Sequence, residues 1–224
     1  MFDAIAGRYD FLNHLLSAGF DRRWRKRAIR SLALTGRECV LDLCTGTADL
    51  AIAAVRARPR AAQVIGIDFA AAMLGVARGK LRQRRFSDEV LLVRGDATCI
   101  PLADGSIDAI TIAFGIRNVE NVAAACAEMR RVLKPNGRLA ILEFAMPTMR
   151  GVRSVYRWYF RRVLPWIGRM VSHDAGAYSY LPASVGAFET PDEFVKILGQ
   201  NGFMAITSVP LTAGIVFLYT GRRS

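Results

Sequence analysis

The chain has 224 residues, of which 52% are hydrophobic, and carries a formal net charge of +12 at pH 7. This length suits a single α/β domain, and the short apolar runs exclude a membrane-spanning helix, which needs about 18 apolar residues in succession. The four cysteines, Cys39, Cys44, Cys99 and Cys126, show no Cys-x-x-Cys spacing and are accompanied by only two histidines, so we expect reduced cysteines and no metal site.

Residues 1–36 are predicted to form a helical cover ahead of the main unit. Apolar side chains recur at helical spacing along the first part of this segment, at Phe2, Ile5, Tyr9, Leu12 and Leu16. A second, strongly basic helix is predicted over residues 21–34, with Asp21 as its N-cap and Gly36 as its C-terminal stop.

From Cys39 onward, short apolar runs alternate with helical patterns. Strands are predicted at residues 39–43, 63–67, 90–94, 107–114, 138–144, 203–209 and 214–220, and helices at 48–57, 70–84 and 120–133. This alternation predicts an α/β fold with a mostly parallel sheet covered on both faces, and Asn136-Gly137 predicts a turn before the fifth strand. Only a loop over residues 208–214 separates the last two strands, which predicts an antiparallel pair. We expect one domain over residues 1–224.

The first predicted strand leads into a loop of small residues, Cys44-Thr45-Gly46-Thr47-Ala48, and then into a helix. A helix N-terminus behind such a loop favours a nucleoside or an anion, because small side chains let a ligand approach the backbone. The dinucleotide fingerprint is Gly-x-Gly-x-x-Gly, and this loop keeps one of those glycines. We therefore expect a nucleoside ligand without a pyrophosphate, with Asp42 inside the strand bracing the loop.

Polar side chains follow the next strands. Asp68 ends the second strand and suits the hydroxyls of a ribose, and Asp96, at the end of the third, lies where an adenine edge can be read. Arg117 and Asn118 follow the fourth strand, which faces the first loop across the switch point of the sheet, so we expect the second substrate there. His173 lies beside an acid in a later segment and is a candidate catalytic base.

The segment over residues 147–200 is predicted to be an insertion between the fifth and sixth strands. One helical stripe of this segment is apolar and aromatic, and another carries Arg150, Arg153, Arg157 and Arg161. A basic amphipathic helix with aromatic side chains is typical of binding at a membrane surface. The alternative is a lid helix that packs its aromatic side chains on the core and leaves its arginines in water.

Several strings in this chain resemble those of class I S-adenosylmethionine-dependent methyltransferases, and more specifically of the quinone-biosynthesis C-methyltransferases. The strings include Asp42 to Asp49, Asp68-Phe69, Gly95-Asp96-Ala97, Phe114-Gly115-Ile116-Arg117-Asn118 and Tyr180-Leu181-Pro182. The resemblance implies a Rossmann-like fold of seven strands, the last antiparallel, with S-adenosylmethionine as the cofactor. It implies cofactor contacts at Asp42, Gly46, Thr47, Asp68, Asp96 and Ala97. It also places Arg117 and Asn118 in the active site, with Tyr9 covering the pocket.

These parts fit methyl transfer to a ring carbon of demethylmenaquinol, a polyprenyl quinol of the membrane. Arg117 is expected to stabilise the ring phenolate and Asn118 to orient it; the base is water or His173, because an arginine is a poor proton acceptor. The opening residues show no export signal, so we expect a cytoplasmic protein. The polyprenyl tail and the positive charge favour contact with the inner face of the cell membrane, whose lipids are anionic.

Three alternatives stay open at this point. The first is a ubiquinone or phylloquinone precursor as the substrate, because few pocket residues distinguish these rings. The arginines also fit an RNA or protein methyltransferase, although no dedicated RNA-binding module is visible and we expect no nucleic-acid partner. The third alternative is a membrane scaffold that binds the cofactor or a quinone without turnover.

Overall fold

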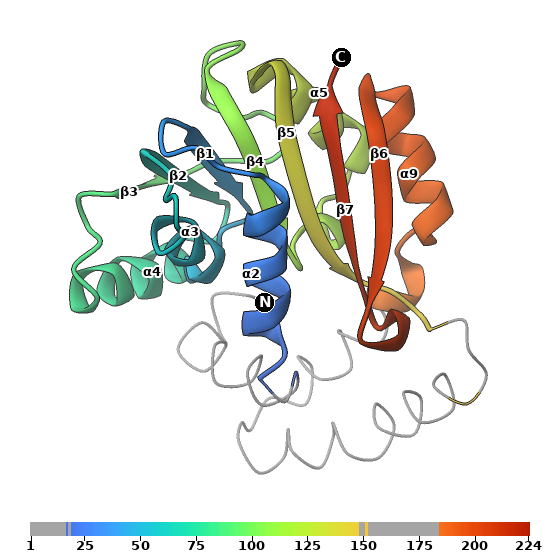
Figure 1. The fold of residues 1–224 in the computed structure, drawn as a ribbon, viewed down its shortest axis with the longest axis horizontal. Helices are drawn as coiled ribbons and strands as arrows, with labels where there is room; N and C mark the ends of the chain where they lie inside the picture. Colours follow the sequence, from blue (N-terminus) through green and yellow to red (C-terminus); the bar gives the residue numbers. More distant parts are fainter. Residues whose placement is uncertain (1–16, 18, 148–150, 152–183) are drawn as a thin grey trace.

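A seven-stranded sheet forms the centre of the protein, with the strand order β3-β2-β1-β4-β5-β7-β6 (Figure 1). The computed structural model describes residues 17, 19–147, 151 and 184–224. The strands are β1 (Cys39–Leu43), β2 (Gln63–Asp68), β3 (Val90–Arg94), β4 (Ile107–Ala113), β5 (Leu133–Phe144), β6 (Phe203–Leu211) and β7 (Val216–Arg223). All seven predicted strands are confirmed. The first five are parallel, and β7 is antiparallel to both β5 and β6, as expected.

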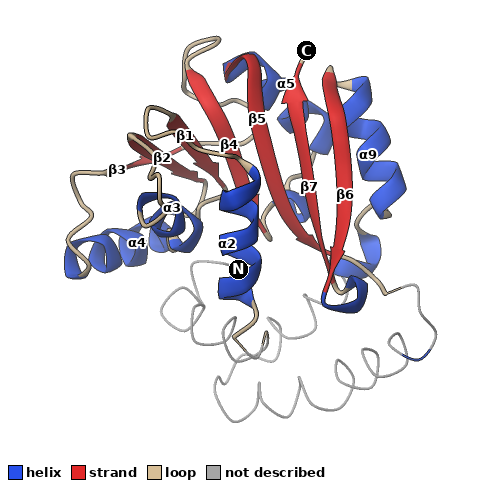
Figure 2. Cartoon of the chain, viewed as in Figure 1, coloured by secondary structure: helices blue, strands red, loops and turns tan. Residues whose placement is uncertain are grey.

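Helices cover both faces of this sheet (Figure 2). They are α2 (Asp21–Ser31), α3 (Asp49–Val55), α4 (Ala71–Gln83), α5 (Val122–Val132) and α9 (Pro191–Gln200). Trp24 of α2 packs with Leu50 of α3 and Leu81 of α4 in one buried cluster. Met129 of α5 and Phe194 of α9 belong to a second cluster on the opposite face. The two clusters explain the apolar strands, because a parallel sheet with helices on both sides has no face in water.

The strand order places a switch point between β1 and β4. The chain runs outward from β1 through β2 to β3, and then returns to the other side of β1 with β4. The two loops that leave these neighbouring strands therefore diverge in opposite directions. In open α/β sheets the crevice at such a point, outside the carboxyl ends of the strands, is where ligands bind.

Helix α2 differs from its prediction at both ends. The N-cap position is Phe20, which makes no side-chain cap, and Asp21 lies in the first turn. The Asp21 carboxylate instead accepts a hydrogen bond from Ser17 and pairs with Arg25, which lies one turn along the same helix. The helix ends at Ser31, before the predicted stop, because Ala33 adopts a left-handed conformation with φ of 47°.

Two predicted turns also differ. Asn136 and Gly137 lie within β5, where the pairing with β4 jumps from Ile107–Leu133 to Ala109–Arg138. The predicted turn is thus an irregularity inside the strand, and Asn136 provides its positive φ of 60°. The loop between the last two strands is shorter than predicted, because β6 continues to Leu211 and only a single 3-10 turn, Thr212–Gly214, follows it.

The end of the predicted insertion belongs to the sheet scaffold. Thr190 and Glu193 form a capping box at the start of α9, and the buried side chains of Phe194 and Leu198 fix this helix against the sheet. The basic amphipathic helix, His173 and the first part of the N-terminal cover, with Tyr9, lie outside the described residues, so their expected roles stay predictions. Within the described ranges, no helix has both the length and the apolarity that a bilayer crossing requires.

Candidate active site

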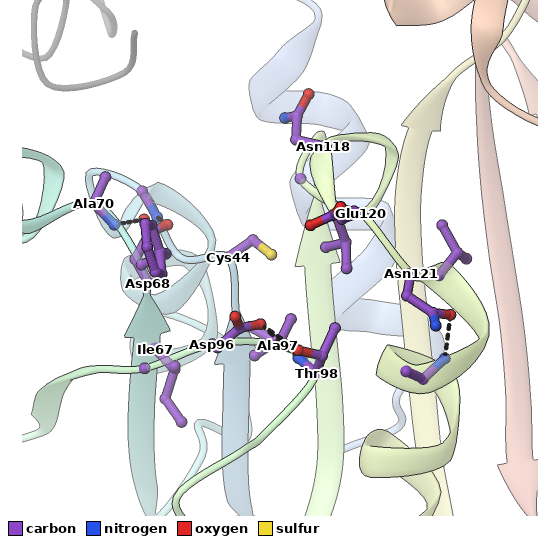
Figure 3. A pocket seen from close by; sticks show the side chains of 18 of the residues that line it. Cys44, Ile67, Asp68, Ala70, Asp96, Ala97, Thr98, Asn118, Glu120 and Asn121 are labelled. Carbon is purple, nitrogen blue, oxygen red and sulfur yellow. Dashed lines mark hydrogen bonds between the residues drawn. The ribbon is translucent and has the colours of Figure 1, made fainter.

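A cavity of about 1010 Å³ opens at the carboxyl ends of the strands on both sides of the switch point (Figure 3). Its wall is built from the segments that follow four strands: Cys44 and Gly46 after β1, Asp68 to Ala70 at the end of β2, Asp96 to Thr98 after β3, and Phe114, Gly115 and Asn118 after β4. Gly46, Asp68, Asp96, Ala97 and Asn118 therefore come together in one cavity, as the sequence predicts. Pockets for small molecules commonly occupy about 300–1,000 Å³, so this one has room for a nucleoside and a second ring.

Asp68 ties two walls of the cavity together. Its Oδ2 accepts a hydrogen bond of 2.8 Å from the backbone N–H of Gly46, and its Oδ1 accepts one of 2.9 Å from that of Ala70 (Figure 3). A carboxylate offers about four acceptor sites, so the half-buried side chain keeps capacity for ligand hydroxyls. Asp68 thus fixes the loop after β1 and presents a negative charge to the same space.

Asp96 supplies a second carboxylate, on an exposed part of the wall. Its Oδ1 accepts hydrogen bonds of 2.8 Å from both the backbone N–H and the hydroxyl of Thr98 (Figure 3). These bonds, that from the backbone first, lower the pKa of Asp96 below its usual value, because they stabilise the charged form. Ala97 beside it is buried and adds a small apolar surface. The pair offers an acceptor next to an apolar contact, which suits the edge and face of a purine.

Close backbone contact shapes the loop after β1. Gly46 has a φ of +54°, and a Cβ added there would meet no atom within 4 Å, so its backbone borders open space. A Cβ on Gly115 would lie 2.3 Å from the Cβ of Cys44, so only glycine lets the loops after β1 and β4 meet. Burial raises the pKa of the Cys44 thiol above its usual value, which keeps it neutral and agrees with a packing role rather than a nucleophilic one.

Asp42 braces the loop after β1, as its place inside the strand predicts, and its side chain does not line the cavity as a cofactor contact would. Its side chain is buried, and its carboxylate accepts hydrogen bonds from the hydroxyls of Thr45 at 2.6 Å and Thr111 at 2.8 Å and from the backbone N–H of Ala51 at 3.1 Å. A buried carboxylate needs such partners, and these hold it away from the cavity wall. Asp42 therefore joins β1 to β4 and to the first turn of α3.

Thr47 likewise stands apart from the cavity wall. Its side chain is buried, and its hydroxyl accepts a hydrogen bond of 3.0 Å from the ammonium of Lys80 on α4. The same ammonium pairs with Asp49 at 2.8 Å. This side chain fixes α3 against α4 behind the loop, and the expected cofactor contact at Thr47 stays a prediction.

Arg117 lies beside the cavity rather than in its wall. Its Nη1 donates to Oε1 of Glu143 and to the carbonyl oxygen of Phe114, both at 2.6 Å, and its guanidinium lies 5.5 Å from the centre of the Phe144 ring. Glu143 is completely buried, so its charge requires a cation at this place. The predicted direct role for Arg117 on a ring phenolate is corrected accordingly. Asn118, the next residue, does line the cavity (Figure 3).

Sequence reasoning missed several residues of this region. Glu143 interrupts an apolar strand, and that signal alone could have marked it as the partner of a buried cation. Phe69, which is 68% exposed, and Met73 add an apolar rim beside Asp68, and Glu120 adds a carboxylate near Asn118. Among the residues that the structure describes, no three His, Cys, Asp or Glu side chains gather as metal ligands.

The sheet with its antiparallel seventh strand and the cavity at its switch point give this protein the class I fold of S-adenosylmethionine-dependent methyltransferases. A putative S-adenosylmethionine-dependent methyltransferase from Methanococcus maripaludis superimposes with a TM-score of 0.74, at 20% identity over 100% of this chain and 94% of that chain. One from Aquifex aeolicus gives a TM-score of 0.64 at 17% identity, over 89% of each chain. These likenesses establish the fold.

The particular family follows from the sequence. The chain belongs to the ubiE/COQ5 methyltransferase family, whose model matches residues 1–223. It is 48% identical to the ubiquinone/menaquinone biosynthesis C-methyltransferase UbiE of Syntrophotalea carbinolica, over 100% of this chain and 93% of that protein. It is 44% identical to the demethylmenaquinone methyltransferase of Thermus thermophilus, over the full length of both. The family expected from the motifs is confirmed.

Proposed function

We propose that this enzyme transfers a methyl group from S-adenosylmethionine to a ring carbon of demethylmenaquinol and so forms menaquinol. The observation that carries the proposal is the cavity in which Asp68, Asp96 and the backbone of Gly46 face one space large enough for a cofactor and a ring. The relatives named for demethylmenaquinone methylation support the substrate, since one of them matches this chain from end to end. Ring methylation of a ubiquinone precursor is the second candidate, because the 48% identical relative is named for both quinones.

The residues present fit S-adenosylmethionine. Asp68 would accept hydrogen bonds from the ribose hydroxyls, and Asp96 with Ala97 would hold the adenine. Gly46, with open space where a side chain would stand, lets the ligand approach the backbone. When bound, the cofactor supplies an electrophilic methyl group on a sulfonium centre. The two carboxylates also make the cavity favourable for a ligand with a positive charge.

The walls after β4 would position the quinol ring. Phe114 and Asn118 line the cavity across from the loop after β1, which places them against the second substrate. Arg117 acts as a positioning residue, because it holds the carbonyl of Phe114 and is itself fixed by Glu143. Holding two reactants in line lowers a barrier by as much as about 7–11 kcal/mol. The phenolic proton leaves to water or to His173, and this second choice stays a prediction. After methyl transfer the ring carbon loses its own proton to water, which restores the aromatic ring as a phenolate that is then protonated again.

Direct measurement of the methylated ring tests the proposal. The protein is incubated with isotopically labelled S-adenosylmethionine and reduced demethylmenaquinone, beside a demethoxybenzoquinol substrate, and products are detected by mass. We expect label in menaquinone and heat of binding when the cofactor is titrated in a calorimeter. Label in added transfer RNA instead of either quinone, or cofactor binding with no methylated product, would overturn the proposal in favour of an RNA methyltransferase or a scaffold.

Contact with a membrane surface forms part of this proposal. A polyprenyl quinol resides in the bilayer, so the enzyme must take its substrate from a lipid surface. The net charge of +12 favours attraction to the anionic lipids of the inner face of the cell membrane. We therefore place the enzyme in the cytoplasm, in peripheral contact with that face.

A further inference from the structure

A second cavity, of about 950 Å³, lies between α2 and α3 and is separate from the candidate active site. We call it the basic groove. Six cationic side chains on its wall are exposed: Arg22, Lys26, Arg30, Arg56, Arg58 and Arg84. Its floor is apolar and includes Ile29 of α2 and Ile52 of α3. Nothing in the proposed methyl transfer uses this groove.

The positive charge of the basic groove is not compensated within the described part of the chain. Asp49 is the acidic residue of its wall, and this carboxylate lies 2.8 Å from Lys80 and 3.4 Å from the buried Arg25. The ion pairs between described residues use none of the six exposed cations. Like charges crowded along one groove repel each other. An anionic partner is therefore attracted by the six cations without competition from an acidic side chain paired with them.

The neighbourhood of the basic groove favours a lipid surface over RNA. Its described wall contains no aromatic side chain, and the nearby ring of Phe86 is already covered by the guanidinium of Arg56 at 5.3 Å from the ring centre, whereas single-stranded nucleic acids are held largely by stacking on aromatic rings. An exposed aromatic side chain lies instead at the start of α2, where Phe20 is 40% exposed and carries the guanidinium of Arg23 at 5.4 Å from its ring centre. A basic helix flanked by an exposed phenylalanine is typical of the membrane interface.

The basic groove is also joined to the candidate active site. Asp49, on its wall, is the first residue of α3, and the loop that runs into this helix lines the cavity at Gly46. A lipid surface held at α2 and α3 would thus lie beside the loop that lines the candidate active site, where a substrate that resides in the bilayer must arrive. This link rests on the proposed function.

We propose that the basic groove between α2 and α3 binds the phosphate headgroups of anionic phospholipids and docks the enzyme on the membrane. The groove cations Arg22, Lys26 and Arg30 of α2, with those of the segment after α3, contact the headgroup phosphates. Phe20, at the start of α2, enters the interface between headgroups and acyl chains.

Two double variants test this docking surface with matched charge. Lys26→Gln with Arg30→Gln removes two cations from the groove; Arg27→Gln with Arg37→Gln removes two exposed cations that lie outside it, one in α2 and one after its end. Binding is measured by co-sedimentation with vesicles of phosphatidylglycerol and phosphatidylcholine in equal parts, and with pure phosphatidylcholine. A cation at an anionic surface changes affinity about fivefold, so the groove variant should bind the anionic vesicles about 30-fold more weakly.

The control variant should lose less than about threefold in affinity for the anionic vesicles. The protein should not co-sediment with pure phosphatidylcholine vesicles, and millimolar inorganic phosphate should not displace it from the anionic vesicles. Equal loss in both variants would overturn the proposal, because overall charge rather than the groove would then drive binding. Tight binding of an oligoribonucleotide that only the groove variant weakens, with vesicle binding unchanged, would also overturn it. Methyl transfer to a detergent-solubilised quinol should be the same in both variants, which separates a failure of docking from a failure of the proposed function.

Discussion

Arg117, in the turn that follows β4, and Glu143, near the end of the neighbouring strand β5, form an ion pair of 2.6 Å between side chains that are 6% and 0% exposed. The same guanidinium donates to the carbonyl of Phe114, which lines the candidate active site. The pair therefore holds one wall of the cavity from behind. Its effect on the reaction passes through Phe114 and Asn118, since the charge of Arg117 is balanced by Glu143 before any substrate arrives.

A double-mutant cycle tests the Arg117–Glu143 pair. Glu143→Gln leaves a buried guanidinium without its counter-charge, and we expect the free energy of unfolding in urea to fall by about 3 kcal/mol. Arg117→Met should lower the free energy of unfolding by a similar amount, because it leaves the buried Glu143 carboxylate without its cation. The double variant should lose clearly less than the sum of the two, because both charges are then gone. Additive losses would mean that the two side chains act independently.

Cofactor affinity should depend on the charge of Asp68. Asp68→Asn keeps one acceptor oxygen but loses the charge-assisted bonds to the loop and to the ribose, so we expect calorimetry to show at least about tenfold weaker binding of S-adenosylmethionine. Asp88→Asn, an exposed acid after α4, is the matched control and should bind as the parent does. Unchanged affinity in the Asp68 variant would remove this residue from the cofactor site.

The contact between Gly115 and Cys44 predicts opposite effects for two glycines. Gly115→Ala places a Cβ within 2.3 Å of the Cys44 Cβ, so the loop must shift. We expect the free energy of unfolding to fall by about 1–3 kcal/mol and the cofactor to bind more weakly. Gly75→Ala, on an exposed position of α4 with nothing within 4 Å, should stabilise by about 0.5–1 kcal/mol, because alanine restricts the unfolded chain and favours a helix. Thermal unfolding of both variants measures these signs.

Stability should fall as pH rises through the titration of Asp42. Burial raises the pKa of this carboxyl to about 6, against the hydrogen bonds from Thr45, Thr111 and Ala51 that lower it. Between about pH 4 and 6 the folded protein therefore holds a proton that the unfolded chain releases, so the free energy of unfolding decreases by about 3 kcal/mol across this window and then levels off.

The Asp42→Asn variant isolates this effect. Its amide keeps the shape of the side chain and can still accept from Ala51, while Thr111 reverses its hydroxyl to accept from the amide. Urea unfolding from about pH 4 to 7 should show a smaller decline in the variant than in the parent protein. Parallel curves would mean that Asp42 is ionised in the folded state throughout this range.

The sequence by itself determined the sheet and the edge of the sheet at which the site lies. Strand-length apolar runs alternating with helices leave little choice but a parallel sheet with covered faces, and Asp68 and Asp96 follow two of its strands. Because parallel strands end at one edge, these carboxylates had to meet there. Such inferences need only the spacing of apolar residues along the chain and the direction of the strands.

Only the tertiary structure decided which polar side chains face the ligand. Asp42 and Thr111 are 69 residues apart and Arg117 and Glu143 are 26 apart, so no local pattern shows that these pairs satisfy each other behind the cavity. A buried charge turns toward whichever partner the neighbouring strand provides, and that choice depends on strand order and register. Asp42 and Arg117 lie in strings of the chain that resemble a methyltransferase site, but their side chains serve to hold that site in shape.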